Sequence, residues 1–230
     1  MSRLMDIKKF YRILSKLEKK NGGKLLFDDC ISLNGLPDTG VYFIFEKGEI
    51  RSTSGDGLRV VRVGSHALMP YSKSTLYNRL RSLRGNDNDW GGKHRRSIFR
   101  RHIGRAIISR NKISCPSWDK RIPPGPRENL VEEKVSRYIR KRCWFLYLAI
   151  DQALDSWKVR RLVARNSIAL LGNCSGAKII DPPSRRWLGL AYPPNINSEI
   201  PESGLWNIQH VRKEYNPDFL DVLYTLVNGM

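Results

Sequence analysis

One tyrosine and two arginines are spaced so that they could hold and activate a phosphate group. Tyr42 lies in the apolar segment 40–45, Arg62 in the apolar segment 58–64, and Arg79 in the amphipathic segment 74–84. An arginine presents planar, forked donors that suit phosphate oxygens. The pattern therefore fits a phosphate site, although a half-buried tyrosine beside a solvated arginine would show the same residues.

The three segments predict a β-hairpin followed by a helix. Segment 40–45 enters through a glycine and reads as a strand, and the polar, glycine-rich stretch 46–57 reads as the hairpin connection. Segment 58–64 reads as the second strand and also ends on a glycine. Segment 74–84 carries leucines at helical spacing, so its arginine can point back at the strand ends.

The remaining chain predicts more helices and one more strand around the same sheet. Helices are expected at 3–20, 93–110, 128–141, 156–171 and 218–227, and a strand at 144–150. The expected fold class is α+β, with a small central antiparallel sheet flanked by helices and helical additions at both ends. Three parts are predicted: an N-terminal helix and connector (1–35), a core (36–175) and a C-terminal extension (176–230).

The charge of the chain favours a polyanionic partner. Its 41 Lys and Arg residues outnumber 22 Asp and Glu residues, for a formal net charge of +19. The densest basic run has almost no acidic residue to offset its repulsion, so we predict that it contacts a DNA backbone rather than forming an ordinary solvated face. Its members are Lys93, His94, Arg95, Arg96, Arg100 and Arg101.

Composition argues against several other classes. No stretch approaches the roughly 18 apolar residues of a membrane span, and the N-terminus lacks the apolar core of a secretory signal. We therefore expect no membrane partner. The four cysteines are widely separated and form no CxxC pair, so reduced thiols and a cytoplasmic location are expected, without a zinc or disulfide framework.

Several motifs together resemble the GIY-YIG nuclease family. Gly40-Val41-Tyr42 is similar to its first signature, and Arg62-Val63-Gly64 stands where Tyr-Ile-Gly would be. Leu76-Tyr77-Asn78-Arg79-Leu80 resembles the helix that carries the family's arginine. The strings Gly92-Lys93-His94-Arg95 and Ser203-Gly204-Leu205-Trp206-Asn207 are similar to a bacterial stand-alone, restriction-like subgroup.

The resemblance implies roles for individual residues. Tyr42 would act as, or orient, the general base, and Arg79 would hold the scissile phosphate. Arg62 replaces the second tyrosine and could stabilise phosphate charge, but its pKa is too high for a base. His66 is a candidate proton carrier, with a structural role as the alternative.

Two departures from the family concern its histidine and its metal ligand. The histidine that often follows the helical arginine by one turn is Leu83 here, so its role is lost or passes to His94 or His102. The family's Glu-x-Asn-x-Ile helix, whose glutamate binds one divalent metal, matches Ala164-Arg165-Asn166-Ser167-Ile168. Ala164 has no ligand oxygen, so Mg²⁺ or Mn²⁺, expected for the active form, should not bind this chain tightly.

Three explanations for Ala164 remain open at this stage. The chain is an inactivated form of a glutamate-bearing nuclease, or the natural protein has lost metal binding, or the match is shifted and Glu132 or Glu133 is the ligand. If Glu132 and Glu133 are not metal ligands, they are expected to be exposed charges that pair with Arg137 or Lys141. Asn173 follows the predicted helix that carries Ala164, and it either lines the site or caps the end of that helix.

The resulting expectation is a metal-dependent, restriction- or defence-like DNA endonuclease, present here as an inactive form that still binds double-stranded DNA. The alternative is a non-catalytic nucleic-acid-binding protein on the same scaffold. A homodimer that cuts both strands is compatible with either function.

Overall fold

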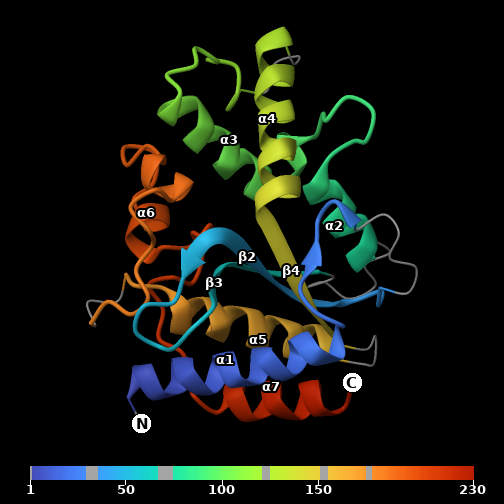
Figure 1. Ribbon diagram of the computed structural model, residues 1–230, viewed down its shortest axis with the longest axis vertical. Helices are drawn as coiled ribbons and strands as arrows, with labels where there is room; N and C mark the ends of the chain where they lie inside the picture. Colours follow the sequence, from blue (N-terminus) through green and yellow to red (C-terminus); the bar gives the residue numbers. More distant parts are fainter. Residues whose placement is uncertain (1, 30–35, 67–74, 121–124, 151–154, 175–177) are drawn as a thin grey trace.

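The computed structural model describes residues 2–29, 36–66, 75–120, 125–150, 155–174 and 178–230, which form an α+β fold in three layers (Figure 1). A sheet of four antiparallel strands lies between two layers of helices. This confirms the expected fold class. The helices of one layer are α1 (Arg3–Lys20), α5 (Ser156–Leu171) and α7 (Phe219–Asn228); those of the other are α2 (Leu76–Arg84), α3 (Ile98–Arg110) and α4 (Pro126–Arg142).

The sheet has β2 (Gly40–Ile50) near its centre, in the order β1-β4-β2-β3. β3 (Leu58–Ser65) and β4 (Cys143–Ala149) flank β2, and both pair with it in antiparallel register. The strand expected at 144–150 is thus confirmed as a member of this sheet. β1 (Leu25–Leu26) was not expected, because two residues are too short to show a strand period.

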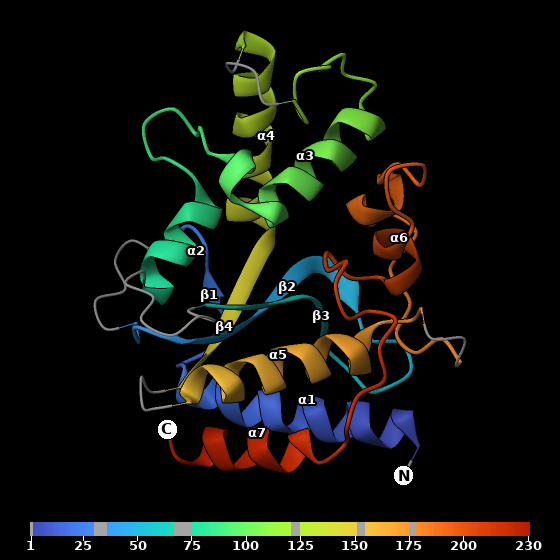
Figure 2. The ribbon, with the colours of Figure 1, turned by 180° about the vertical axis from the view of Figure 1, so that it is seen from behind.

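Strand alternation determines which layer each side chain of β2 meets. Val41 and Phe43 pack with α1, α5 and α7 in one core cluster. Tyr42 and Ile44 pack with α2, α3 and α4 in the other. Figure 2 shows α5 along the first face, above α1 and α7. The candidate tyrosine therefore faces the layer that carries the candidate arginine helix.

The basic segment 93–110 is two helical pieces rather than the one helix expected. His94–Arg96 form the short helix η2, and α3 begins after Ser97. Ser97 has an extended backbone (φ −134°, ψ 104°), and its side chain accepts a hydrogen bond from the Arg100 N–H at 3.4 Å. A serine in this N-cap role starts a new helix, which interrupts the earlier turn.

The C-terminal part completes the free edge of the sheet. After η3 (Leu188–Ala191) and α6 (Glu199–Ser203), the chain runs beside β3. The Trp206 N–H donates to the Val61 carbonyl at 2.7 Å, and the Asn207 amide bonds both backbone groups of Val63, at 3.0 and 2.9 Å. These bonds cover an edge that would otherwise be open to pairing.

Both ends of the chain pack into the body formed by its middle. Residues of α1 and α7 share one core cluster with β2, β4 and α5, so the three-part division at 35 and 175 stays a prediction. None of the helices in the described segments has the length and apolar character needed to cross a membrane.

Candidate active site

Tyr42 and Gly64 face each other across the β2–β3 pair. Their Cα atoms are register partners, and the tyrosine ring lies directly over the glycine. A Cβ atom at position 64 would lie 2.1 Å from Tyr42 Cζ and 2.3 Å from its hydroxyl. No side chain fits at that distance, so the glycine that ends the second strand is what makes room for the buried tyrosine.

Arg62 lies on the same face of the sheet as Tyr42, two residues before Gly64. It is 7% exposed, and its Nη1 donates to the Trp206 carbonyl at 2.6 Å. Its guanidinium carbon lies 4.9 Å from the centroid of the Phe99 ring. Burial lowers the pKa of Arg62, with the positive charge of Arg79 adding to that effect and Tyr42 opposing it. The C-terminal segment therefore holds this arginine against the tyrosine.

Arg79 reaches the same point from α2. Leu76, Leu80 and Leu83 bury the other face of this helix in the cluster that contains Tyr42. Thr75 caps the helix by accepting a hydrogen bond from the Asn78 N–H at 3.2 Å. Arg79 itself stays half-buried beside the tyrosine.

The electrostatics of this trio favour an anion. Burial alone would raise the pKa of Tyr42, but the positive charges of Arg79 and Arg62, and their hydrogen bonding to the phenol oxygen, outweigh it and lower that pKa. Among the residues that the structure describes, none of the groups that shift the pKa of Tyr42 or Arg62 is a carboxylate. Two guanidinium groups beside one phenol suit a phosphate.

The ionisation of Tyr42 can be measured directly. We expect two tyrosines, Tyr42 and the exposed Tyr224, to ionise below the ordinary pKa of about 10, and we expect Tyr42→Phe to remove one of these two steps from an absorbance titration at the phenolate band. Arg79→Ala should move the Tyr42 step to higher pH, because it removes a positive charge that stabilises the phenolate. A titration curve identical in the parent protein and Tyr42→Phe below pH 10 would contradict this arrangement.

The two histidines at this end of the molecule have different surroundings. His66 ends the β3 segment, where its N–H donates to the Gly40 carbonyl at 3.1 Å. His102, on α3, is buried one turn after Phe99, with Nδ1 3.1 Å from the Tyr192 hydroxyl. Burial, reinforced by the charges of Arg62 and nearby arginines, lowers the pKa of His102 to about 3. His102 is therefore a neutral imidazole near Arg62, and whether it or His94 takes the role of the family's histidine, or the role is lost, stays a prediction.

A protein-family model described as GIY-YIG domain matches residues 1–230. The chain belongs to the GIY-YIG domain family. The resemblance found in the motifs is thereby confirmed. Membership indicates a nuclease-type function with DNA as the substrate, in a family whose nucleases generally depend on a divalent metal. No curated protein and no solved structure matches the chain.

The residues of this GIY-YIG chain do not fit the family's metal. Ala164 lies on α5, is 6% exposed, and packs in the core cluster on the opposite face of the sheet from Tyr42. Its methyl group offers no ligand atom. Within the described segments, no three His, Cys, Asp or Glu side chains come together to hold an ion.

Glu132 and Glu133, the alternative ligands, are engaged elsewhere. One oxygen of Glu132 accepts from His94 N and Nδ1 at 2.5 and 2.9 Å, and the other accepts from Arg100 Nε at 3.0 Å. Glu133 forms an ion pair with Arg137 at 2.9 Å, the surface pairing expected from the sequence. Neither carboxylate is among the groups that shift the pKa of Tyr42 or of Arg62.

The predicted DNA-contacting run divides into surface and interior residues. Lys93 and Arg96 are exposed, whereas His94 and Arg100 are buried and bound to Glu132. Arg95 and Arg101 are partly exposed; Arg95 pairs with Glu128 at 2.9 Å, and Arg101 donates to the Arg95 carbonyl at 3.3 Å. Sequence spacing could not reveal these carboxylate partners, which lie more than 30 residues away.

Asn173 lies apart from the tyrosine cluster. Its side chain donates to the Ile180 carbonyl at 3.0 Å and accepts from the Ile180 N–H at 3.1 Å. It also accepts from Arg3 Nη2 at 3.1 Å. These bonds join the end of α5 to the segment near residue 180 and to α1, so the geometry gives Asn173 a structural connection.

Proposed function

We propose that this protein binds double-stranded DNA at the Tyr42–Arg62–Arg79 site and is a GIY-YIG endonuclease in a form that Ala164 makes inactive. The observation that supports the proposal is the pair of guanidinium groups around one buried phenol, with no carboxylate among their described charge partners. An arrangement built only for stability would normally pair buried arginines with acids.

Each side chain has a role that follows from its position. Arg79, half-buried, holds the phosphate, and Arg62, fixed by the Trp206 carbonyl, adds charge from the sheet side. Tyr42, whose pKa is lowered by these arginines, accepts a proton from a water or orients it. Mg²⁺ or Mn²⁺ would supply Lewis-acid charge in an active form; this chain lacks the family's ligand for it. Binding without efficient cleavage is the expected outcome.

The biological setting belongs to the same proposal. A restriction- or defence-like role, a cytoplasmic location and a homodimer are our predictions from the sequence. A second candidate function is non-catalytic DNA binding on a GIY-YIG scaffold. It is favoured by Ala164 and by Arg62, which replace the glutamate and the second tyrosine of the family pattern.

DNA affinity of single variants tests the site. We expect the protein to bind a duplex, and Arg79→Ala and Arg62→Ala each to weaken binding about 10-fold, which corresponds to about 1.4 kcal/mol. The matched control is Arg137→Ala, since Arg137 is a surface residue on α4 already paired with Glu133. If Arg79→Ala and Arg62→Ala bind the duplex as tightly as the parent protein, the proposal that these arginines bind a DNA phosphate is wrong. Brisk Mg²⁺-dependent cutting by the parent protein would contradict the inactive form.

A further inference from the structure

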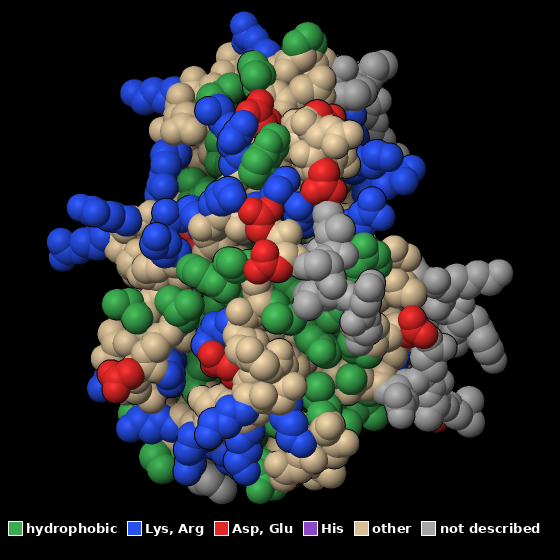
Figure 3. Space-filling view, turned by 45° about the vertical axis from the view of Figure 1, so that its right-hand side comes forward, with side chains coloured by type: hydrophobic (Ala, Val, Ile, Leu, Met, Phe, Trp, Pro, Cys, Tyr) green, Lys and Arg blue, Asp and Glu red, His purple; other side chains and the backbone are tan. Residues whose placement is uncertain are grey.

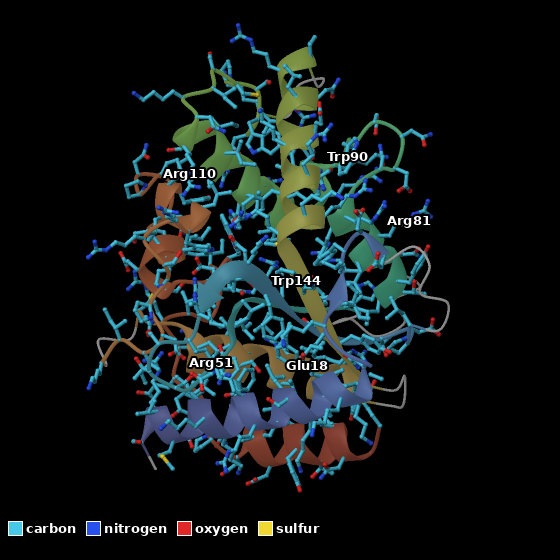
Figure 4. All side chains as sticks on the ribbon, in the orientation of Figure 1. Glu18, Arg51, Arg81, Trp90, Arg110 and Trp144 are labelled. Atoms are coloured by element: carbon cyan, nitrogen blue, oxygen red, sulfur yellow. The ribbon has the colours of Figure 1, made fainter. Side chains whose placement is uncertain are left out.

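A polar groove of about 630 Å³ lies beside the helix that carries Arg79. One wall is α2, and the other is formed by the connection from α2 to η2. Figure 4 shows Arg81 projecting outward from α2, with Trp90 on the connection next to α4. The lining includes the cationic side chains of Arg81, Lys93 and Arg96, the acids Asp87 and Asp89, and the polar side chains of Asn78 and Ser82.

The buried Arg100 links α2, one wall of this groove, to α4. Its Nη1 donates to the carbonyl of Leu83 on α2 at 2.8 Å, and its Nη2 donates to Ser136 on α4 at 2.8 Å. Gly92 lies so close that a Cβ atom there would be 2.1 Å from Arg100 Nη2. One guanidinium group, held by its ion pair with Glu132, therefore ties the α2 wall to α4 and packs against Gly92 of the other wall.

The connection after α2 is held closed by further contacts. The Asn86 N–H donates to the Gly91 carbonyl at 2.8 Å. The Trp90 ring lies against α4, with the Arg140 guanidinium carbon 3.8 Å from the ring centroid. A loop fixed in this way can present a groove without first being ordered by a ligand, which lowers the cost of binding.

Most of the unpaired charges in the groove are positive. Arg81, Lys93 and Arg96 are exposed, and their side chains form no ion pair or hydrogen bond with any residue in the described ranges. Of the two acids that line the groove, Asp87 pairs with Arg84 at 2.5 Å, whereas Asp89 accepts the Gly91 N–H at 2.8 Å and keeps its negative charge. Figure 3 shows Lys and Arg side chains gathered on the upper half of this side of the molecule, around only a few acids.

We propose that this groove holds the phosphates that adjoin the one at Arg79, along one strand of duplex DNA. Ser82 is one turn after Arg79 on α2, and Arg81 is one turn after Asn78, so the face of the helix that lines the groove borders the face that carries Arg79. Backbone contacts of this type give affinity and position without reading sequence. The inference rests on the proposed function and adds Arg81 to the surface members of the basic run, Lys93 and Arg96.

The test compares two triple variants of the full chain on a duplex of about 10 base pairs. One removes the groove charges (Arg81→Ala, Lys93→Ala, Arg96→Ala). The other removes three equally exposed charges of α1, in the opposite layer (Lys8→Ala, Arg12→Ala, Lys19→Ala). The groove variant should lower affinity on the order of 100-fold at low salt, with a salt slope smaller by about 2 to 3. The α1 variant should stay within about 3-fold of the parent protein.

The outcomes separate this inference from the function on which it rests. Equal losses in both triple variants would mean diffuse attraction to a basic surface and would overturn the groove. An unchanged groove variant, alongside a weakened Arg79→Ala protein, would also overturn the groove while leaving the phosphate site intact. A parent protein that does not bind the duplex would reject both. Unchanged thermal unfolding of the triple variants, which alter only exposed side chains, serves as the folding control.

Discussion

Ala164→Glu is expected to give this protein Mg²⁺-dependent cleavage of supercoiled plasmid that the parent chain lacks. A bound metal contributes several kcal/mol of charge stabilisation in phosphodiester hydrolysis, so the rate should rise on the order of 100-fold or more. Tyr42, Arg62 and Arg79 meet without help from position 164. Ala164 packs in the core cluster on the other face of the sheet, so a gain of cleavage would show that a metal held at position 164 reaches the phosphate bound by this trio. The measurement is conversion of plasmid to nicked and linear forms with Mg²⁺ and with a chelator.

The environment of position 164 gives the same substitution a second readout. The residue is 6% exposed within an apolar cluster, so an unpaired carboxylate there should destabilise the fold. If Mg²⁺ binds the new carboxylate, the ion should return stability, by about 2.7 kcal/mol when its concentration is 100 times its Kd. Thermal unfolding with and without Mg²⁺ measures this directly. The control is Ala164→Gln, because glutamine has the size of glutamate without its charge. The unfolding temperature of this variant should not change with Mg²⁺.

The combination of results distinguishes the two candidate functions. Cleavage together with a Mg²⁺-dependent thermal shift supports the endonuclease reading and places the metal at position 164. If Ala164→Glu neither cuts nor gains a Mg²⁺ shift, yet still binds DNA, non-catalytic binding is the better description. Tyr42→Phe in the glutamate background completes the comparison, because it should abolish the gained cleavage while leaving DNA binding within about 3-fold.

Local sequence patterns were enough to predict the hairpin and the helix that frame the site. The strands around Tyr42 and Arg62 carry dense apolar runs bounded by glycines, and the helix of Arg79 carries leucines at helical spacing. Gly64 also has a local cause, since the tyrosine ring opposite leaves no space for a side chain. These features depend on contacts within one β-hairpin and the helix that follows it. Such short-range contacts appear in the sequence as apolar residues that repeat at strand or helix spacing.

Features that depend on distant partners could not be predicted in this way. Arg62 is fixed by the Trp206 carbonyl, 144 residues along the chain, and the hydrogen-bond partner of His102 is Tyr192. Arg100 looked like a surface member of a basic run, yet it is 0% exposed because Glu132 supplies its counter-ion. A one-dimensional charge pattern cannot separate a solvated arginine from one that is buried against a remote carboxylate.

The burial of that pair leads to the second large expected effect. Glu132→Gln should lower the free energy of unfolding at pH 7 by about 3 kcal/mol, because removing one partner of a buried ion pair leaves the other charge uncompensated. Arg100 is 0% exposed and the Glu132 side chain 5%, so water cannot replace the lost carboxylate. Glu133→Gln is the matched control on the same helix, and its exposed pair with Arg137 should be worth only about 0.3–0.5 kcal/mol. Urea unfolding of the three proteins measures both differences.

The pH dependence of the Glu132 variant tests the cause of the effect. Burial opposes ionisation of Glu132, but hydrogen bonds from His94 and the charge of Arg100 prevail and lower the pKa of Glu132. A carboxyl group with a lowered pKa in the folded state stabilises the protein above its ordinary value of about 4.3 and loses that contribution as the pH falls through the folded value. The difference between the parent protein and Glu132→Gln should therefore be largest near neutral pH and shrink in acid. A difference that stays constant from pH 7 to pH 3 would show that packing, and not the ion pair, accounts for the lost stability. Since the same pair ties the α2 wall of the groove to α4, Glu132→Gln should also weaken DNA binding although Glu132 carries no positive charge.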